Sequence, residues 1–584
     1  MSSTSQILAS YPALDRIVKR LNSYLRRRHP DYFGSSAEHP CSGLKSYKVI
    51  HDNLWGTNRF SWRELAIIDS PIFQRLREIH QTGLAYQTYP CAHHTRFEHS
   101  LGVATIASRA FDALAQRHAR DFQTIANELG VKLPDFSTTL REELRMAALL
   151  HDLGHSMFSH ASEHVYSELP LVRSAVRELR TFVGAKKGAG EVLSFCLSRT
   201  SAIRELLTRA QSLLPDKDRA QVLDIDLENV SLLIVGRSKH PYLQFMGDII
   251  SSDLDSDKLD YLLRDANAAG LPLRYDLERY LYSIAIVPDI LPDGDGYLEG
   301  LYRRVGTAVK REEPTPAVPD PYFNTYRLRL PREAMNTIEQ IVICKFMLFS
   351  YIYHHRKVRS AEGLLAAMLT KLTERWAAAG QKDEQILEKF LDLTDSSLHG
   401  ELLSRRVDGQ TRDYALRIHR RLLPREVYGF VASRHSHAEG SLLSTFIKVL
   451  RGGKGLPQDR RLRDETLKKF HNIMGAELRR IEPSLGKTAS EALWNAGAWL
   501  DAPRPPKFEN INLLIGTSKD AVPLSDIFPI HYWIQAYESH RYAVRVFCFS
   551  EHLPAVRAAA RIACEQVMKV TTDSFYDKAE RKRV

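Results

Sequence analysis

The amino-acid sequence predicts a mainly α-helical protein, with helical extensions around a helical core and a small α/β appendage at the C-terminal end. Apolar residues recur at intervals of about 3.6 through most of the chain, which is the period of an amphipathic helix. Ser61 and Glu64 are spaced as a capping box in front of one such segment. Apolar segments with β-branched residues near the C-terminal end indicate short strands.

Four regions are predicted along the chain. They are an N-terminal helical arm (1–45), a core (46–365), a helical extension (366–505) and a small α/β region (506–584). A proline-containing linker at 501–510 precedes the last region. In that region we expect two strands and a helix, at 511–517, 542–550 and 553–569.

The elements of the predicted core follow in order. Residues 45–55 indicate a strand or extended segment that turns at Gly56. Residues 97–114 and 140–155 have the helical period and are expected to be buried helices. The remaining expectations are a loop at 184–191, a helical pair over 241–270 with a polar joint at 251–256, a β-type region over 287–323 that includes 296–310, and further helices from residue 332.

The composition indicates a folded protein that binds polyanionic partners. Apolar residues make up 44% and charged residues 26% of the chain, and the formal net charge is +11. This charge suits nucleotide phosphates, nucleic acid or an anionic membrane. There is no uncharged apolar run of about 18 residues and no signal-peptide core. We therefore expect a cytoplasmic protein that does not span a membrane, with its six scattered cysteines reduced.

Four residues of metal-binding types occur in separate motifs: His99, the adjacent His151 and Asp152, and Asp257. Two imidazoles and two carboxylates make a mixed nitrogen and oxygen site for a divalent metal ion such as Mg, Mn, Fe, Ni or Zn. A single histidine on an apolar helix is more often a core residue. However, burying both His151 and Asp152 behind an apolar helix costs free energy unless they have a partner. The occurrence of all four residues in such motifs favours a metal site that catalyses hydrolysis at phosphorus.

Helical spacing extends this site. If the sequence HDLGH continues its helix, His151 and His155 share one face because they are four residues apart. A second helix carries a polar stripe at positions i, i+4, i+7 and i+8, which is expected to face a polar ligand. This stripe consists of Asp257, Tyr261, Arg264 and Asp265.

Three motifs carry a resemblance to a known family: RFEHSLGV at 96–103, HDLGHSMFSH at 151–160 and DSDKLDYLLRD at 255–265. They resemble the HD-domain phosphohydrolases. More narrowly, they resemble the deoxynucleoside triphosphate triphosphohydrolases of the bacterial dGTPase type and of the mammalian type with SAM and HD domains. IDSPIFQRLREIHQTG, TYPCAHHTRFEHSLGV and YIYHHRKV extend the resemblance over roughly residues 45–365. It implies an HD-domain helical core, without a SAM domain in the N-terminal region.

The resemblance implies roles for individual residues. The metal ligands correspond to His99, His151, Asp152 and Asp257, and the catalytic residues to His155, His160, Asp257 and Arg96. The substrate-binding residues correspond to Gln81, Arg96, Lys258, Tyr261, Asp265, Lys345, Tyr353 and His354. Among these, Arg96, Lys258 and Lys345 would contact phosphates. Gln81, Asp265 and Tyr353 would hold the deoxyribose.

The sequence departs from the family pattern at two positions. The family has a His-Glu pair after the HD motif, whose histidine acts as the general acid or supports it, whereas this chain has Gly190 followed by Glu191. His160 or His164 then remains as the proton donor. Thr82 stands where the mammalian enzyme has a leucine against the sugar, so sugar or base selectivity is expected to differ.

The implied reaction converts a dNTP and water to a deoxynucleoside and inorganic triphosphate. The resemblance also implies a homo-oligomer, either a dimer, a tetramer or a hexamer, that a nucleotide activates. The activator-binding residues correspond to Lys48, Val49, Asp69, Gln74 and Arg77, although Asp69 and Arg77 would also suit an intramolecular ion pair.

Two other classes of function fit the sequence. An HD-type phosphodiesterase or nuclease that acts on single-stranded nucleic acid, or on another nucleotide, suits the positive charge. A nucleotide-sensing scaffold without activity is the other class, since the family's His-Glu histidine is missing.

Overall fold

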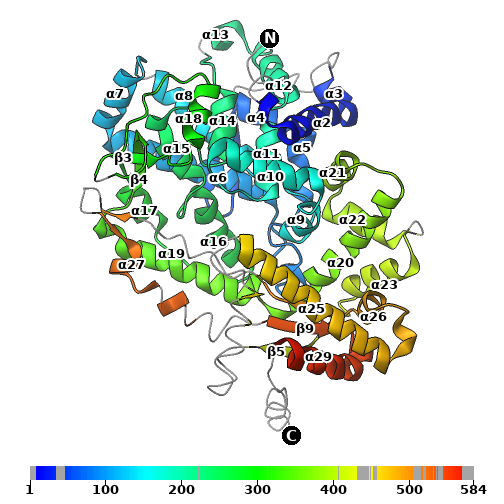
Figure 1. Cartoon of the computed structure of the whole chain (residues 1–584). Helices are drawn as coiled ribbons and strands as arrows, with labels where there is room; N and C mark the ends of the chain where they lie inside the picture. Colours follow the sequence, from blue (N-terminus) through cyan, green and yellow to red (C-terminus); the bar gives the residue numbers. More distant parts are fainter. Residues whose placement is uncertain are drawn as a thin grey trace.

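The computed structural model is mainly α-helical, which confirms the predicted fold class (Figure 1). In the described part of the chain the helices are accompanied by four small antiparallel sheets. None of the described helices is long and apolar enough to cross a membrane. The described residues are 8–34, 47–133, 135–219, 222–316, 318–404, 407–430, 446, 449–450, 457–503, 514–516, 521–530, 532–534, 536 and 544–568.

The N-terminal arm is anchored on the core by α2 (Pro12–Arg28), which packs against α10 (Pro170–Val183) and α11 (Ala189–Ser198). Its buried face carries apolar residues three or four positions apart, as an amphipathic helix requires; they are Leu14, Ile17, Leu21 and Leu25. The short helix α3 (Pro30–Phe33) follows. The rest of the predicted arm, 1–7 and 35–45, lies outside the described residues.

A β-hairpin precedes the core helices. The strand predicted at 45–55 is β1 (Tyr47–Asp52), and it pairs with β2 (Gly56–Ser61), which the mostly polar sequence did not predict. Gly56 turns the chain with a positive φ of 67°. The predicted capping box is present at the start of α4 (Trp62–Ile68), because the backbone N–H of Ser61 donates to Glu64 Oε2 at 2.7 Å.

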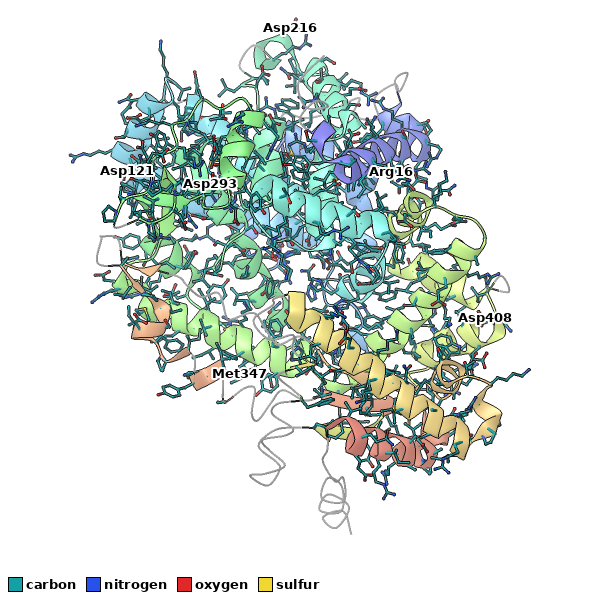
Figure 2. All side chains as sticks on the ribbon, in the orientation of Figure 1. Arg16, Asp121, Asp216, Asp293, Met347 and Asp408 are labelled. Atoms are coloured by element: carbon teal, nitrogen blue, oxygen red, sulfur yellow. The ribbon has the colours of Figure 1, made fainter. Side chains whose placement is uncertain are left out.

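Three helices carry the predicted site. They are α6 (Arg96–Arg117), α8 (Asp135–Leu150) and α16 (Ser256–Ala268), and α6 packs against both of the others. Side chains fill the space between the helices of the core (Figure 2). The surrounding helices are α5 (Pro71–Gln74), α7 (Ala119–Glu128), α9 (His160–Tyr166), α12 (Ser201–Ser212), α13 (Asp216–Arg219), α14 (Leu227–Ile234), α15 (Gln244–Ile250), α17 (Leu277–Ser283), α19 (Met335–Leu348) and α20 (Arg356–Ala378).

The helix expected over 140–155 ends earlier than predicted. The helix α8 stops at Leu150, and the HDLGH sequence forms turns instead. His151 and His155 therefore do not share a helical face. The chain turns because Gly154 lies directly on α11, where a Cβ would collide with the backbone of Gly190 and Ser194.

The β-type region expected over 287–323 is only partly correct. Two eight-residue strands, β3 (Ala285–Pro292) and β4 (Tyr322–Arg329), pair as an antiparallel hairpin around it. Most of the segment 296–310 forms the helix α18 (Tyr297–Arg304) instead. The buried carboxylate of Asp293, labelled in Figure 2, begins this helix by accepting from the backbone N–H groups of Leu298 at 2.8 Å and Glu299 at 2.9 Å.

The C-terminal half combines further helices with a three-stranded sheet. The strand β9 (Val544–Cys548) lies between β5 (Arg425–Phe430) and β6 (Trp499–Asp501), so the regions 366–505 and 506–584 share one sheet. The expected helix at 553–569 is α29 (Leu553–Met568). The other elements are α21 (Asp383–Asp392), α22 (Asp395–Leu403), α23 (Gly409–His419), α25 (Pro457–Ile481), α26 (Ala489–Asn495), β7 (Leu514–Ile515), β8 (Val522–Pro523) and α27 (Leu524–Ile527).

Candidate metal centre

The structure brings the four predicted ligand residues together where α6, α8 and α16 meet. Asp257 Oδ1 lies 3.1 Å from His99 Nε2 and 3.8 Å from His151 Nε2. Asp152 lies beside them, with Oδ2 3.6 Å from His99 Nε2 and Oδ1 3.4 Å from His151 Nε2. Donor atoms of His99, His151 and Asp257 all lie within 4.8 Å of one another, so this group could hold a metal ion.

Helix ends place these side chains. His99 lies in the first turn of α6, which begins after Thr95, and Asp257 lies in the first turn of α16. His151 and Asp152 directly follow the last residue of α8. Three segments that are distant in sequence thus meet through their termini.

The orientation of both imidazoles fits a metal ligand. His99 Nδ1 lies 2.7 Å from Asp260 Oδ2, and His151 Nδ1 lies 2.6 Å from the carbonyl oxygen of Ala148. The Nε2 atoms of His99 and His151 are buried and have no hydrogen-bond partner among the described residues. Buried nitrogens of this kind are costly unless something binds them. A divalent ion held by the two Nε2 atoms and the carboxylates would satisfy both.

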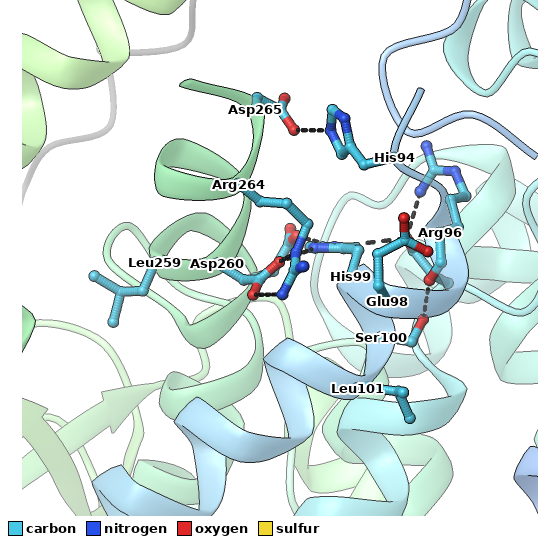
Figure 3. Close-up of polar contacts among 12 residues, drawn as sticks. His94, Arg96, Glu98, His99, Ser100, Leu101, Leu259, Asp260, Arg264 and Asp265 are labelled. Atoms are coloured by element: carbon cyan, nitrogen blue, oxygen red, sulfur yellow. Dashed lines mark hydrogen bonds and ion pairs between the residues drawn. The ribbon is translucent and has the colours of Figure 1, made fainter. Parts of the chain in front are cut away.

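Behind His99 lies a buried charged network (Figure 3). Asp260 accepts from Arg264 Nε at 2.7 Å and from Trp55 Nε1 at 2.5 Å, and Arg264 Nη2 also pairs with Asp52 Oδ2 at 2.9 Å. Burial raises the pKa of Asp260, but Arg264 and His99 lower it more, to about 2. Asp260 is therefore a charged carboxylate that fixes the orientation of the His99 ring.

Two features of this network differ from the predicted site. Arg264 was expected to face a polar ligand, but its guanidinium is buried between Asp260 and Asp52. Asp260 is absent from the predicted site. A signal for it exists, because metal-binding histidines usually donate their second nitrogen to a carboxylate. Gly102, one turn after His99, makes room for it, since a Cβ there would collide with Asp260.

Arg96 connects the centre to a strained turn. Its Nη1 donates to Asp152 Oδ2 at 2.5 Å and its Nε to Ser159 Oγ at 2.9 Å, while Nη2 is buried and has no partner in the described part of the chain. Phe158 and Ser159 both have positive φ, 52° and 53°, which is unfavourable for residues with a Cβ. Asp395, the first residue of α22, holds this turn by accepting from the backbone N–H of Phe158 at 2.6 Å.

A second group of side chains lies beside Asp152. His155 Nε2 is 3.4 Å from Asp152 Oδ1, and His160 Nδ1 is 3.0 Å from Glu163 Oε2. The rings of His155 and His160 meet edge to face, with centroids 5.7 Å apart. Burial and the charge of Arg96 lower the pKa of His155 to about 3. Glu163 is a further residue that was not predicted, although its position three residues after His160 on α9 is the signal for such a contact.

The predicted sugar-binding residues are partly brought together. Asp265 Oδ1 lies 2.7 Å from His94 Nε2, and Asp265 Oδ2 accepts from the hydroxyl of Tyr353. Tyr261 is on the same helix, α16, one turn before Asp265. Gln81 Oε1 is buried without a hydrogen-bond partner among the described residues.

The remaining predicted substrate residues are Lys258, Lys345 and His354. Lys258 Nζ donates to Asp255 Oδ2 and to the carbonyl oxygen of Ser252, both at 2.7 Å, so the structure directs it to the polar joint before α16. Lys345 is a half-buried residue of α19. His354 is buried after α19 and lies edge-on to Phe349, with ring centroids 5.5 Å apart.

The predicted activator-binding residues lie at the surface near the hairpin. Lys48 Nζ pairs with Asp69 Oδ2 at 2.8 Å, so Asp69 has an ion-pair partner other than the expected Arg77. Arg77 Nε donates to Gln74 Oε1 at 2.8 Å, and its guanidinium lies over the ring of Phe97 at 3.5 Å. Val49 is 56% exposed, which leaves an apolar surface beside this pair.

Metal binding to the centre is expected to release protons. Burial lowers the pKa of His99, but Asp257 and Asp260 raise it more, to about 10, and the pKa of His151 is also raised, by Asp152 and Asp257 against burial. A metal ligand must be a neutral imidazole. Below pH 10 the ion displaces a proton from His99, so affinity rises with pH. Calorimetric titration with Mn²⁺ at pH 8 in two buffers of different ionisation enthalpy should show about one proton or more released per ion. Equal heats in both buffers would contradict this assignment.

Residues 96–207 match the family model described as HD domain, and this segment includes Arg96, His99, His151 and Asp152. The crystal structure of a hypothetical protein from Aquifex aeolicus has a similar fold, with a TM-score of 0.52 at 19% identity, over 88% of this chain and 99% of that one.

Curated relatives match between about two fifths and three fifths of the chain. The chain is 31% identical over 251 residues to the deoxynucleoside triphosphate triphosphohydrolase SAMHD1 of Homo sapiens, which is 41% of this chain and 36% of that protein. It is 25% identical over 362 residues to the SAMHD1 homolog of Dictyostelium discoideum, 61% of this chain and 55% of that protein. An uncharacterized protein of Methanocaldococcus jannaschii is 28% identical over 350 residues, 60% of this chain and 52% of its own length.

The chain thus spans about half or less of the length of these relatives. The segment that matches the HD model contains His99 and the adjacent pair His151 and Asp152, and Asp257 lies beyond that segment. Residues 96–207 thus resemble an HD domain, and the chain is similar over part of its length to deoxynucleoside triphosphate triphosphohydrolases.

Proposed function

We propose that this protein is a metal-dependent dNTP triphosphohydrolase, which converts a dNTP and water to a deoxynucleoside and inorganic triphosphate. The observation that carries the proposal is the convergence of two buried imidazole nitrogens, which have no hydrogen-bond partner among the described residues, on the carboxylates of Asp152 and Asp257. A divalent ion bound there supplies a Lewis acid for a phosphate oxygen and lowers the pKa of a water molecule. Two relatives named as triphosphohydrolases of deoxynucleotides support the substrate class.

Arg96 is the residue best placed to receive a phosphate. Two of its nitrogens hold Asp152 and Ser159, which fixes the guanidinium, and the buried Nη2 remains to donate to a phosphate oxygen. Donors that are held in place before the substrate binds stabilise developing charge without reorganisation. Lys258 and Lys345 complete the proposed triphosphate contacts.

The nucleoside side of the proposed site is formed by Asp265, Tyr353 and Gln81. The Asp265 carboxylate, with His94 on one oxygen and the Tyr353 hydroxyl on the other, would accept a hydrogen bond from a sugar hydroxyl. Gln81, on the segment that leads into α6, offers an amide oxygen that has no hydrogen-bond partner in the described part of the chain. Tyr261 and His354 would pack against the sugar and the base.

The leaving 5′-oxygen needs a proton, and His160 is placed to supply it. Its side chain is 74% exposed, at the open side of the group. Neighbouring protein atoms lower the pKa of His160, but the Glu163 carboxylate raises it more, so the imidazolium persists to a higher pH than usual. His160 thus compensates for the glycine at position 190. The proposal includes a nucleotide-activated homo-oligomer, with the activator at Lys48, Val49, Asp69, Gln74 and Arg77.

A product assay tests the proposed function. The full chain is incubated with each dNTP and either Mg²⁺ or Mn²⁺, and ³¹P NMR follows the phosphorus products. We expect inorganic triphosphate and deoxynucleoside, without pyrophosphate or dNMP, because attack occurs at the α-phosphorus and expels the 5′-oxygen.

A labelled single-stranded oligonucleotide and cyclic nucleotides serve as competing substrates in the same assay. Cleavage of the oligonucleotide with intact dNTPs would replace the proposal by the nuclease alternative. No product from any substrate at saturating metal, with and without dGTP as activator, would contradict an enzymatic function.

A further inference from the structure

The turn that leads into α9 is held by contacts from outside its own segment. Phe158 and Ser159 both have positive φ, 52° and 53°, and such backbone persists only where surrounding groups fix it. We propose that Asp395 of α22 fixes this turn and is thereby a positioning residue for Arg96 and His160. The inference rests on the proposed function, which assigns a phosphate contact to Arg96 and proton donation to His160.

The Asp395 carboxylate joins two segments that are distant from it in sequence. Its Oδ1 accepts from the backbone N–H of Phe158 at 2.6 Å, and its Oδ2 accepts from the backbone N–H of His80 at 3.0 Å. The same Oδ2 lies 2.5 Å from His80 Nδ1. The side chain is 5% exposed, so water competes little for these contacts. Because hydrogen bonds to an ionised carboxylate are stronger than those between neutral groups, Asp395 can hold a strained turn.

Ser159 connects the turn to Arg96. Its hydroxyl donates to the carbonyl oxygen of His80 at 2.6 Å and accepts from Arg96 Nε at 2.9 Å. The guanidinium is thus fixed by Ser159 on one side and by Asp152, at 2.5 Å, on the other, while its Nη2 is buried without a partner among the described residues. A displaced turn would release the Ser159 contact, and Nη2 would lose its fixed direction.

The place of His160 depends on the same turn. His160 directly follows Ser159 and is the first residue of α9. Its imidazole meets the ring of His155 edge to face and pairs with Glu163 of the same helix. A change of the backbone at Ser159 would therefore shift the proton donor relative to its neighbours. Small displacements of this kind are costly, because proton transfer and phosphate contacts both require aligned groups.

The contact of Asp395 with the turn is separate from the anchoring of α22. Thr394 is the N-cap of this helix, and its hydroxyl accepts from the backbone N–H of Ser397. Glu78 holds the start of α22 by accepting from the hydroxyls of Thr394 at 2.8 Å and Ser396 at 2.7 Å. Replacement of Asp395 leaves these contacts in place. Glu78→Gln is therefore a control that weakens the anchoring of α22 without removing a contact of the turn.

The test compares full-length Asp395→Ala with Glu78→Gln in Mg²⁺. ³¹P NMR follows triphosphate release from dNTPs, and equilibrium dialysis measures the dissociation constant of inorganic triphosphate. Asp395→Ala should lower kcat about 10- to 100-fold and raise this dissociation constant about tenfold, because His160 and Arg96 both lose their positions. Its Mn²⁺ affinity should stay within about threefold of the wild type, because Asp395 is hydrogen-bonded to Phe158 and His80 rather than to the metal ligands. Glu78→Gln should keep kcat and triphosphate binding within about twofold, since Glu78 is exposed.

Two further measurements test the route through Ser159. Amide hydrogen exchange of the peptide that contains Phe158 should accelerate in Asp395→Ala but not in Glu78→Gln. Ser159→Ala alone should weaken triphosphate binding. Added to Asp395→Ala, it should change the dissociation constant by less than about twofold, because both substitutions act on the same contact with Arg96. Independent effects that multiply would overturn this route.

Unchanged kcat and triphosphate binding in Asp395→Ala, or an equal loss in Glu78→Gln, would overturn the positioning role. A loss of kcat with unchanged triphosphate binding would reject the role for Arg96. If Asp395→Ala does not fold by circular dichroism, Asp395→Asn decides by the same criteria, because it keeps the shape of the side chain and one acceptor oxygen.

The proposed function can fail separately, because triphosphate binding needs no turnover. A wild type that binds inorganic triphosphate but releases none from any dNTP rejects the proposed function, and the binding by Asp395→Ala still decides the positioning role. A wild type that does neither rejects both.

Discussion

Replacing Asp257 with alanine is expected to remove the ion of the metal centre and to lower triphosphate release at least about a thousandfold, or roughly 4 kcal/mol of transition-state stabilisation. Asp257 Oδ1 lies 3.1 Å from His99 Nε2 and 3.8 Å from His151 Nε2, so this one carboxylate oxygen is close to both imidazole nitrogens. Its side chain is 35% exposed, so the truncation leaves no buried cavity. Triphosphate release by ³¹P NMR and bound Mn²⁺ per chain are the two measurements.

Asp216→Ala is the matched control, because the Asp216 side chain is 97% exposed and lies on α13, outside the site. It should retain wild-type turnover and metal content. Turnover of Asp257→Ala within tenfold of the wild type, with its fold verified by circular dichroism, would reject Asp257 as a ligand.

Replacing Asp260 with asparagine is expected to weaken Mn²⁺ binding at the metal centre about 10- to 100-fold. The asparagine keeps the shape of the side chain but removes the charge that accepts from His99 Nδ1 and orients its ring. The variant should also unfold more easily, by about 1–3 kcal/mol, because Arg264 loses a charged hydrogen-bond partner in the interior. Isothermal titration with Mn²⁺ and urea unfolding measure the two effects.

Asp52→Asn separates the effect on the metal from the effect on stability. Asp52 pairs with the same guanidinium, at 2.9 Å from Arg264 Nη2, but does not touch His99. It should lower the free energy of unfolding to a similar extent and leave Mn²⁺ affinity within about threefold. If both variants weakened Mn²⁺ binding equally, Asp260 would act only through general stability.

The sequence was sufficient for the fold class and for bringing His99, His151, Asp152 and Asp257 into one hypothesis, because the motifs carry the chemistry in short, ordered segments. Asp260, the partner of His99, was not predicted. In the sequence it is one of several acidic residues of a helix, and its contacts with His99 and Arg264 become visible only in the structure.

The local sequence pattern was also insufficient in three other parts of the chain. The helix period of residues 140–155 continues through HDLGH, but close packing of Gly154 on α11 ends the helix at Leu150. The segment 296–310 looked β-like, yet the carboxylate of Asp293 begins a helix in it. The strand β9 pairs with β5, which lies more than a hundred residues earlier, and neither strand carries a sequence pattern that predicts this pairing.

The contact of Asp395 with the turn at Phe158 affects how the protein can be dissected. Asp395 lies far beyond the segment 96–207, but it is hydrogen-bonded to backbone that sits between His155 and His160. A recombinant fragment cut at the matched boundaries would lack this contact as well as Asp257 and Asp260. Any minimal catalytic fragment therefore has to extend at least through α22 (Asp395–Leu403).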